Sequence, residues 1–157
     1  MKRKACKKKK KKKKNRASLE KKLWSIFSRF IRIRDAVKTT GGSEYLNCIT
    51  CGKSVQIAGS DCNAGHFQTR AHKATKFDEQ NVHGQCVSCN KYHSGEQFIH
   101  GQKIVLMYGQ EALDRILSLK YESRQYKVYE LEELVTEYRL KIREYTDKYG
   151  NPWKTEL

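Results

Sequence analysis

The sequence of 157 residues contains no long run of apolar residues. A helix that crosses a bilayer needs roughly 20 consecutive apolar residues, and no stretch of the chain approaches that length. The basic residues at the N-terminus are not followed by the apolar segment of a secretory signal peptide. We therefore expect a cytoplasmic protein. In that reducing compartment, paired cysteines are more often metal ligands than disulfides.

Acidic residues are absent from positions 1–16, which hold ten lysines and two arginines. Residues 7–14 are eight consecutive lysines, which repel one another and bury nothing, so we predict a disordered basic arm over residues 1–16. Much of the formal net charge of +16 is therefore local. Such an arm attracts nucleic acid by releasing the counterions of phosphates. Lysine clusters also attract anionic lipid, but we favour nucleic acid and predict no membrane partner.

Residues 17–40 carry apolar side chains at three- and four-residue steps, the pattern of an amphipathic helix. Ser18 is the expected N-cap, and the two glycines within residues 39–43 break the helix. The apolar stripe is Leu19, Leu23, Ile26, Phe27, Phe30, Ile33 and Val37, widened by Trp24 and Ile31. The other side carries Arg29, Arg32, Arg34 and Lys38. These basic residues are either simply solvated or form a face that contacts phosphates together with the arm.

Residues 41–100 show little helical periodicity but hold all five histidines and five of the six cysteines. Something other than a large apolar core must order this segment, and bound metal is the simplest candidate. Residues 101–157 form a C-terminal helical region, with the pattern returning at Gln102 and a longer helix that ends at Gly150. The apolar stripe of that longer helix fits packing on the core or pairing with a second subunit.

Two Cys-x-x-Cys pairs lie 34 residues apart, Cys48 with Cys51 and Cys86 with Cys89. Each pair can supply two thiolates to a tetrahedron, so together they predict a four-cysteine structural zinc site. A redox pair is the alternative for either pair taken singly. Cys6 lies in the arm and is expected to be a free thiol, and Cys62 is expected to be a packed thiol.

A closed four-cysteine site has no open coordination position, so the zinc should not act in catalysis. Closing it folds the segment that contains His66 against Asn90, the residue after the last cysteine. A neutral imidazole suits a general base that activates water, and a carboxamide oxygen suits Mg²⁺ together with water and a phosphate.

The order Cys-x-x-Cys, His, Asn, Cys-x-x-Cys-Asn resembles the zinc-braced branch of the HNH or ββα-metal nucleases. The stretches AGHFQTR, KFDEQNVHGQCVSCNKYHSG and GQEALDRI resemble the phage NinG recombination proteins, also called Rap. That resemblance covers about residues 23–145 and implies a phage or prophage protein that acts as a structure-specific endonuclease on branched DNA. The stretch CVSCN alone is similar to the recombination endonuclease VII family of junction resolvases, in which the following asparagine binds the catalytic metal.

By this resemblance His66 is the general base, Asn90 a ligand of a catalytic Mg²⁺ or Mn²⁺, and Asn81 the residue that orients the loop carrying the base. His93 could add a ligand or contact the phosphate. HNH motifs place an acidic or histidine ligand directly before the base, where this chain has Gly65. NinG proteins often have an aspartate three residues before the histidine, where this chain has Asn63. Asp61 is the expected substitute as the anionic ligand.

Basic residues near the expected base are candidate DNA contacts. Arg70 and Lys73 follow the base in a loop and are favoured as phosphate contacts over salt-bridge partners. Three further candidate DNA contacts are Arg29 and Arg32 on the first helix and Lys91 directly after Asn90. The remaining histidines are expected at the surface or behind the ligands: His72, His83 and His100.

We therefore predict an α+β fold with a zinc-braced HNH-like core at residues 41–100 flanked by N- and C-terminal helices. The expected function is metal-dependent cleavage of branched recombination intermediates, of the Holliday-junction or D-loop type, and the expected partner is branched or single-stranded DNA. Symmetric cutting of a junction needs two active sites, so a homodimer is expected, through the helix at residues 128–149. The alternatives are a non-catalytic zinc module that binds DNA and an HNH nickase without junction preference.

Overall fold

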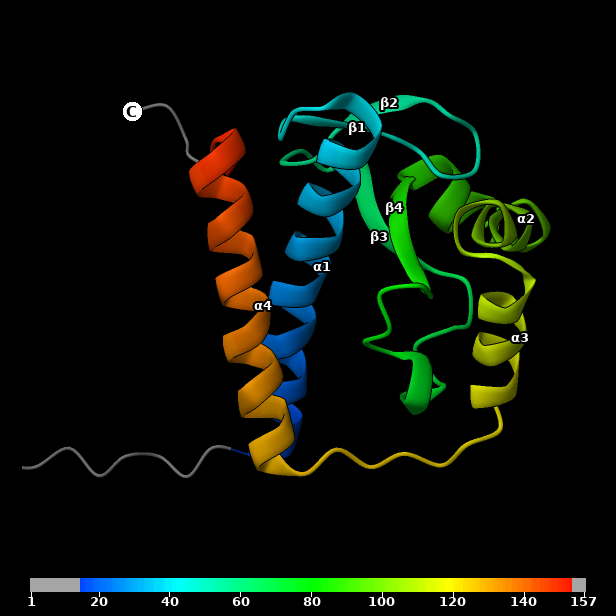
Figure 1. Cartoon of the computed structure of the whole chain (residues 1–157), viewed down its shortest axis with the longest axis vertical. Helices are drawn as coiled ribbons and strands as arrows, with labels where there is room; N and C mark the ends of the chain where they lie inside the picture. Colours follow the sequence, from blue (N-terminus) through cyan, green and yellow to red (C-terminus); the bar gives the residue numbers. More distant parts are fainter. Residues whose placement is uncertain (1–14, 154–157) are drawn as a thin grey trace, which may run out of the picture.

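The computed structural model describes residues 15–153 as an α+β arrangement of helices around two small antiparallel sheets (Figure 1). Of the basic arm predicted over residues 1–16, the first 14 residues, with Cys6, lie outside the described residues. In chain order the elements are α1 Arg16–Thr40, β1 Tyr45–Asn47, β2 Ser54–Gln56, β3 Cys62–His66, η1 Lys73–Thr75, β4 Val82–Cys86, η2 Ser88–Tyr92, α2 Gln97–Tyr108, α3 Gln110–Leu119 and α4 Val128–Tyr149. No helix within residues 15–153 is both long and apolar enough to cross a bilayer.

Helix α1 begins two residues earlier than the expected cap. Asn15, not Ser18, is the N-cap: its side chain accepts a hydrogen bond of 3.0 Å from the amide of Ala17. Arg16, which we assigned to the arm, is therefore the first residue of the helix. The helix ends at Thr40 and is capped by Gly41, whose φ of 74° is the left-handed conformation that glycine adopts easily. The amide of Gly41 donates to the Val37 carbonyl.

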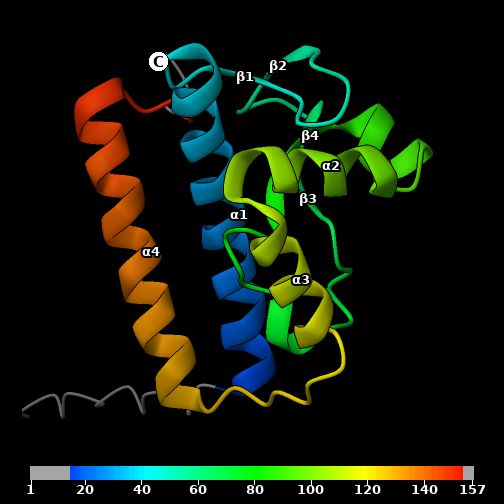
Figure 2. The same ribbon diagram turned by 45° about the vertical axis from the view of Figure 1, so that its right-hand side comes forward.

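The apolar stripe of α1 packs against α4, which runs beside it over most of its length (Figures 1 and 2). The ring of Tyr138 on α4 lies 4.9 Å from that of Phe27 and 5.1 Å from that of Phe30, measured between centroids. Leu131 and Val135 of α4 are buried in the same core. The apolar stripe considered for pairing with a second subunit is thus covered by α1 of the same chain.

The hairpin of β3 and β4 packs against α1, and hydrogen bonds to a buried ion pair of the helix join the two. The Arg34 guanidinium donates to Asp35 at 2.7 Å and to the carbonyls of Glu79 and Val82, while Asp35 accepts from the amide of Gly84 at 2.7 Å. Arg34 is only 3% exposed. It was expected on the solvated or phosphate-contacting face, and it instead fixes the helix to the hairpin.

Helices α2 and α3 cover the side of the hairpin that faces away from α4 (Figure 2). Helix α2 begins at Gln97, five residues before the expected start, and this places His100 against the hairpin. His83 Nδ1 and His100 Nε2 are 3.0 Å apart, and His83 Nε2 is 3.3 Å from the hydroxyl of Tyr108. His83 and His100, expected at the surface or behind the ligands, are core residues with 2% and 0% exposure.

Acidification below pH 6.5 should destabilise the protein because the buried histidines are held neutral. Burial lowers the pKa of His100 from 6.5 to about 4, and that of His83 well below 6.5. The unfolded chain then binds protons that the folded chain excludes, so stability that is present above pH 6.5 is lost as the pH falls towards 4. For His100 the loss is about 2 kcal/mol at pH 5.

Urea unfolding at pH 7 and pH 5 measures this loss, with His100→Gln as the matched variant. The variant lacks the titrating ring, so its free energy of unfolding should change less between the two pH values. An equal change in both proteins would contradict the assignment to His100.

Candidate metal cluster and basic pocket

The four predicted cysteine ligands meet at one end of the hairpin. Their sulfur atoms all lie within 4.8 Å of one another, so they could hold a metal ion. Cys48 follows β1 and Cys51 closes the next turn, while Cys86 ends β4 and Cys89 lies one turn further on, in η2. The turn between the first pair is closed by a 2.8 Å bond from the amide of Gly52 to the Cys48 carbonyl. Four thiolates at this spacing suit tetrahedral coordination.

Cys62 faces Cys86 across the hairpin but does not belong to the four-sulfur group. It is 4% exposed, as expected for a packed thiol, and burial raises its pKa to about 12. The cluster therefore uses both Cys-x-x-Cys pairs and leaves the fifth described cysteine protonated in the core.

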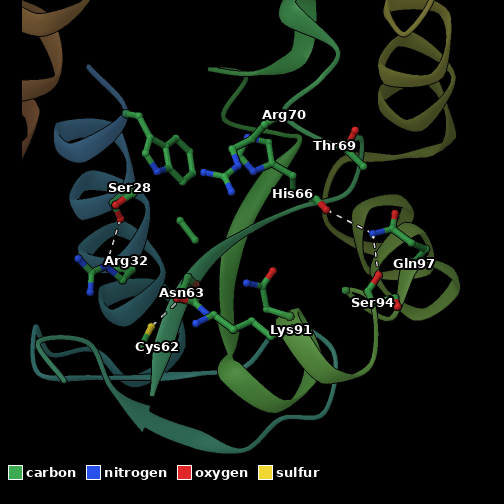
Figure 3. A pocket seen from close by; sticks show the side chains of 14 residues that line it. Ser28, Arg32, Cys62, Asn63, His66, Thr69, Arg70, Lys91, Ser94 and Gln97 are labelled. Carbon is green, nitrogen blue, oxygen red and sulfur yellow. Dashed lines mark hydrogen bonds between the residues drawn. The ribbon is translucent and has the colours of Figure 1, made fainter. Parts of the chain in front are cut away.

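A pocket of about 500 Å³ opens beside the cluster, between α1, β3 and the segment that joins η2 to α2 (Figure 3). His66 and Asn63 from β3 line it on one side and Asn90 from η2 lines it on another. Residues 15–153 contribute no aspartate or glutamate to its lining. The basic side chains that line it are Arg32, Arg70 and Lys91, which come from three separate segments (Figure 3). This charge favours an anionic ligand.

His66 is held in one tautomer by the main chain. Its Nε2 lies 3.0 Å from the carbonyl oxygen of Lys76, which can only accept, so Nε2 carries the proton and Nδ1 keeps its lone pair. The imidazole packs on the indole of Trp24, with ring centroids 5.0 Å apart. Burial, together with the positive charges of Arg70 and Lys76, lowers the pKa of His66 to about 4. At neutral pH the ring is therefore uncharged and Nδ1 can accept a proton.

Asn81 holds the loop that follows His66 and does not line the pocket. The side chain is completely buried, accepts from the Gln68 amide at 2.6 Å, and donates to the carbonyls of Gln68 and Thr75 at 2.9 Å. Its own carbonyl accepts from the amide of Phe67 at 2.9 Å. Asn81 therefore positions the residues next to His66 without reaching the pocket itself.

Two residues predicted as metal ligands lie away from His66. Asp61 is exposed and precedes β3, so the length of the strand separates it from His66, and it does not line the pocket. His93 pairs with Glu96 at 3.0 Å and faces the side of the cysteine cluster that carries Cys51. The pocket therefore brings together His66 and Asn90, but neither Asp61 nor His93.

Some of the residues predicted to contact phosphate already pair with other groups of the protein, and others line the pocket. Lys73 forms a 3.0 Å ion pair with Glu20, contrary to the preference for a phosphate contact. Arg29 stacks on the indole of Trp153 at 4.7 Å, outside the pocket lining. Arg32 lines the pocket but also donates to the Ile57 carbonyl at 2.6 Å. Arg70 lines the pocket with its guanidinium 5.2 Å from the centroid of the Trp24 ring.

Two residues of the site were not singled out from the sequence. Trp24 was treated as part of the apolar stripe, although it lies against the candidate base. Gln85 was not considered, yet it is completely buried next to Gly65 and Asn90. The two-residue period of a strand would have placed Gln85 on the same face as Asn63, had the register of the hairpin been known.

Fold and site together define an α+β protein with a four-cysteine cluster beside a basic, histidine-containing pocket. The sequence profile described as Bacteriophage Lambda NinG protein matches residues 1–148, so the chain belongs to the NinG family. It is similar to Protein ninG of Escherichia phage 933W, with 33% identity over 116 residues. It is also similar to Protein ninG of Escherichia phage lambda, at 32% over 116 residues, and of Salmonella phage P22, at 31% over 119 residues.

These alignments cover 73%, 73% and 75% of this chain but only 52%, 51% and 53% of the respective relatives. The chain thus spans about half the length of the curated relatives that it matches. No solved structure matches the chain.

Proposed function

We propose that this protein is a metal-dependent DNA endonuclease of the HNH or ββα-metal type that cuts branched recombination intermediates, such as Holliday junctions. The observation that carries the proposal is the neutral His66, whose Nε2 proton is bound by the Lys76 carbonyl and whose Nδ1 is left as a base at a basic pocket. The preference for branched DNA rests on the NinG family resemblance alone.

In the proposed reaction, His66 Nδ1 removes a proton from a water molecule as the water oxygen forms a bond to phosphorus. The bond between phosphorus and the leaving ester oxygen breaks in the same step. The charge that develops on the phosphoryl oxygens faces Arg32, Arg70 and Lys91, which line the same pocket. The Trp24 ring keeps one face of the imidazole from solvent. The hydrogen bond to Lys76 stabilises the orientation of the ring while it is protonated.

Asn90 and Asn63 are the lining residues that would hold a catalytic Mg²⁺ or Mn²⁺. Their carboxamide oxygens are hard ligands of the kind that these ions accept. The side-chain nitrogen of Asn63 is buried without a hydrogen-bond partner, and a half-turn of the amide would put the oxygen in its place. When bound, the ion would supply positive charge at the phosphate and the leaving oxygen. The four cysteines would hold a structural Zn²⁺ that fixes the start of η2, and with it Asn90, against β3.

Two alternatives differ in what the pocket does. A non-catalytic DNA-binding accessory protein is favoured by the lack of any acidic residue in the lining contributed by residues 15–153. A nickase without junction preference would use the same groups on linear DNA.

Symmetric cleavage of a junction needs two active sites, so we propose a homodimer. Its contact would lie outside the apolar stripe of α4, because α1 of the same chain covers that stripe.

Cleavage of a labelled four-way junction and of a matched linear duplex separates these functions. The protein is incubated with Mg²⁺, with Mn²⁺ and with chelator. Junction cutting that requires the ion supports the proposal, and equal cutting of the duplex supports the nickase. Tight junction binding without cleavage in either ion would reject the nuclease and leave the accessory protein.

Replacing Arg70 with alanine should weaken junction binding several-fold and lower the salt dependence by about one phosphate contact. Lys73→Ala, three residues away, is the matched control because its ammonium group is paired with Glu20. It should change affinity by less than about twofold. Fluorescence anisotropy at several salt concentrations measures both effects. A larger effect from Lys73 would mean that the ion pair opens when DNA binds.

A further inference from the structure

Two amide oxygens converge on the backbone of Gly65, the residue before the proposed base. A Cβ atom added to Gly65 would overlap the Oε1 atom of Gln85 and would lie 3.0 Å from the Oδ1 atom of Asn90. Gly65 does not have a positive φ, so its lack of a side chain serves the close approach of these oxygens and not a special backbone conformation. The space that a ligand side chain at position 65 would fill is therefore filled by Gln85.

The side chain of Gln85 is fixed at one end and unsatisfied at the other. Its Nε2 donates to the Gly95 carbonyl at 2.9 Å and to the Thr50 hydroxyl at 3.4 Å, which sets the direction of Oε1. Gln85 is 0% exposed, and Oε1 has no hydrogen-bond partner. Buried acceptors are seldom left unpaired because the lost hydrogen bond to water is not replaced, so this atom calls for an explanation, and a bound ligand is one.

Asn63 adds a third carboxamide on the same face of the hairpin. It is the register partner of Gln85 in the pairing of β3 with β4, and it lines the pocket. Its Nδ2 atom is buried without a partner. A half-turn of the terminal amide exchanges Nδ2 and Oδ1, so the same position can present an oxygen. The unsatisfied atoms of Asn63 and Gln85 thus belong to neighbouring side chains beside Asn90.

We propose that Asn63, Gln85 and Asn90 form an all-carboxamide site for one divalent cation, and that a DNA phosphate supplies the anionic ligand that the protein lacks. This inference rests on the proposed function and names its metal ligands. Three neutral oxygens next to Arg32 and Lys91 bind a free divalent cation weakly. Mg²⁺ is commonly held by carboxylates together with substrate phosphates, and here the phosphate provides the negative charge. Cation uptake is therefore coupled to DNA binding.

The site is tested first on the protein alone, with Mn²⁺ as the probe and the free ion measured by electron paramagnetic resonance. The wild-type protein should bind Mn²⁺ only weakly, with Kd above about 1 mM. Asn63→Asp adds one negative charge at the site and should tighten binding at least about tenfold. An unchanged affinity would overturn the location of the site.

The role of Gln85 is tested in the Asn63→Asp background. Adding Gly65→Ala places a methyl group where Gln85 Oε1 lies and should return Mn²⁺ binding to the wild-type level. Adding Gly42→Ala instead is the matched control, because its Cβ would meet no atom within 4 Å. The zinc content and circular dichroism of each variant report whether it is folded. A folded Gly65→Ala protein that keeps the tight site would overturn the role of Gln85.

The coupling to DNA is tested with the wild-type protein and a four-way junction. The complex should take up one more Mn²⁺ than the protein and the junction take up separately, and no additional uptake would overturn the coupling. These binding measurements do not depend on cleavage. Failure to cut DNA with the predicted Mn²⁺ binding intact rejects the nuclease, whereas cutting without the predicted binding rejects this ligand set.

Discussion

Replacing His66 with alanine should lower the rate of junction cleavage by about 10²–10⁴-fold, the usual contribution of a positioned general base. Affinity for the junction should change little, because the imidazole is neutral and Arg32, Arg70 and Lys91 keep the charge of the pocket. Single-turnover cleavage and anisotropy separate the two quantities. His72→Ala is the matched control, since His72 is bonded to the Lys120 carbonyl and does not line the pocket.

The pH dependence of the same reaction identifies the form of the base. A histidine acts as a base only when neutral, and burial has lowered the pKa of His66 from 6.5 to about 4. The value of kcat/KM should therefore show no His66 inflection near 6.5 and should stay level down to the pH at which the protein begins to unfold. For the substitution of His66, equal single-turnover rates of junction cleavage by the His66→Ala and His72→Ala proteins would show that another group activates water.

Replacing Cys86 with serine should remove the bound metal and lower the melting temperature by at least about 10 °C, because metal binding is coupled to folding in sites of this kind. The cluster joins the turn after β1 to the end of β4, and Cys48, Cys86 and Cys89 belong to the second apolar core of the molecule, so losing the metal also loosens that core. Metal content by mass spectrometry and thermal unfolding by circular dichroism measure the two effects.

Cys62→Ala is the matched control for the metal prediction. Cys62 is buried opposite Cys86 and lies outside the four-sulfur group, so the variant should keep one metal ion and lose only about 1 kcal/mol of stability. Loss of metal from Cys62→Ala, or its retention by Cys86→Ser, would contradict the four-cysteine assignment.

The features that could be predicted from the sequence are those with a strong periodicity or a closed ligand set. The stripe of α1 has a 3.6-residue period, so its extent was predicted within a few residues, although Asn15 competes successfully with Ser18 for the cap. The two Cys-x-x-Cys pairs implied that the chain between them folds back. This bends β3 onto β4 and brings His66 and Asn90 to one pocket.

The features that could not be predicted depend on strand register and on contacts between distant segments. A five-residue strand separates Asp61 from His66, and the sequence does not show where that strand begins. The burial of His100 requires α2 to start at Gln97, in a stretch without clear periodicity. Lys73 meets Glu20 across 53 positions of the chain, a pairing that local patterns do not contain. The position of Gln85 beside the pocket depends on Gly65, because any side chain at position 65 would overlap Gln85 Oε1.

The bond between His66 and the carbonyl of Lys76 affects which sequence changes the site can tolerate. Because a main-chain atom fixes the ring, any residue that keeps the local backbone at position 76 preserves the tautomer. The number of residues between positions 66 and 81 is constrained, since Asn81 is tied to Gln68 and Thr75. An insertion or deletion in that loop would therefore be more harmful than most substitutions within it. Related sequences should diverge in composition there while conserving its length.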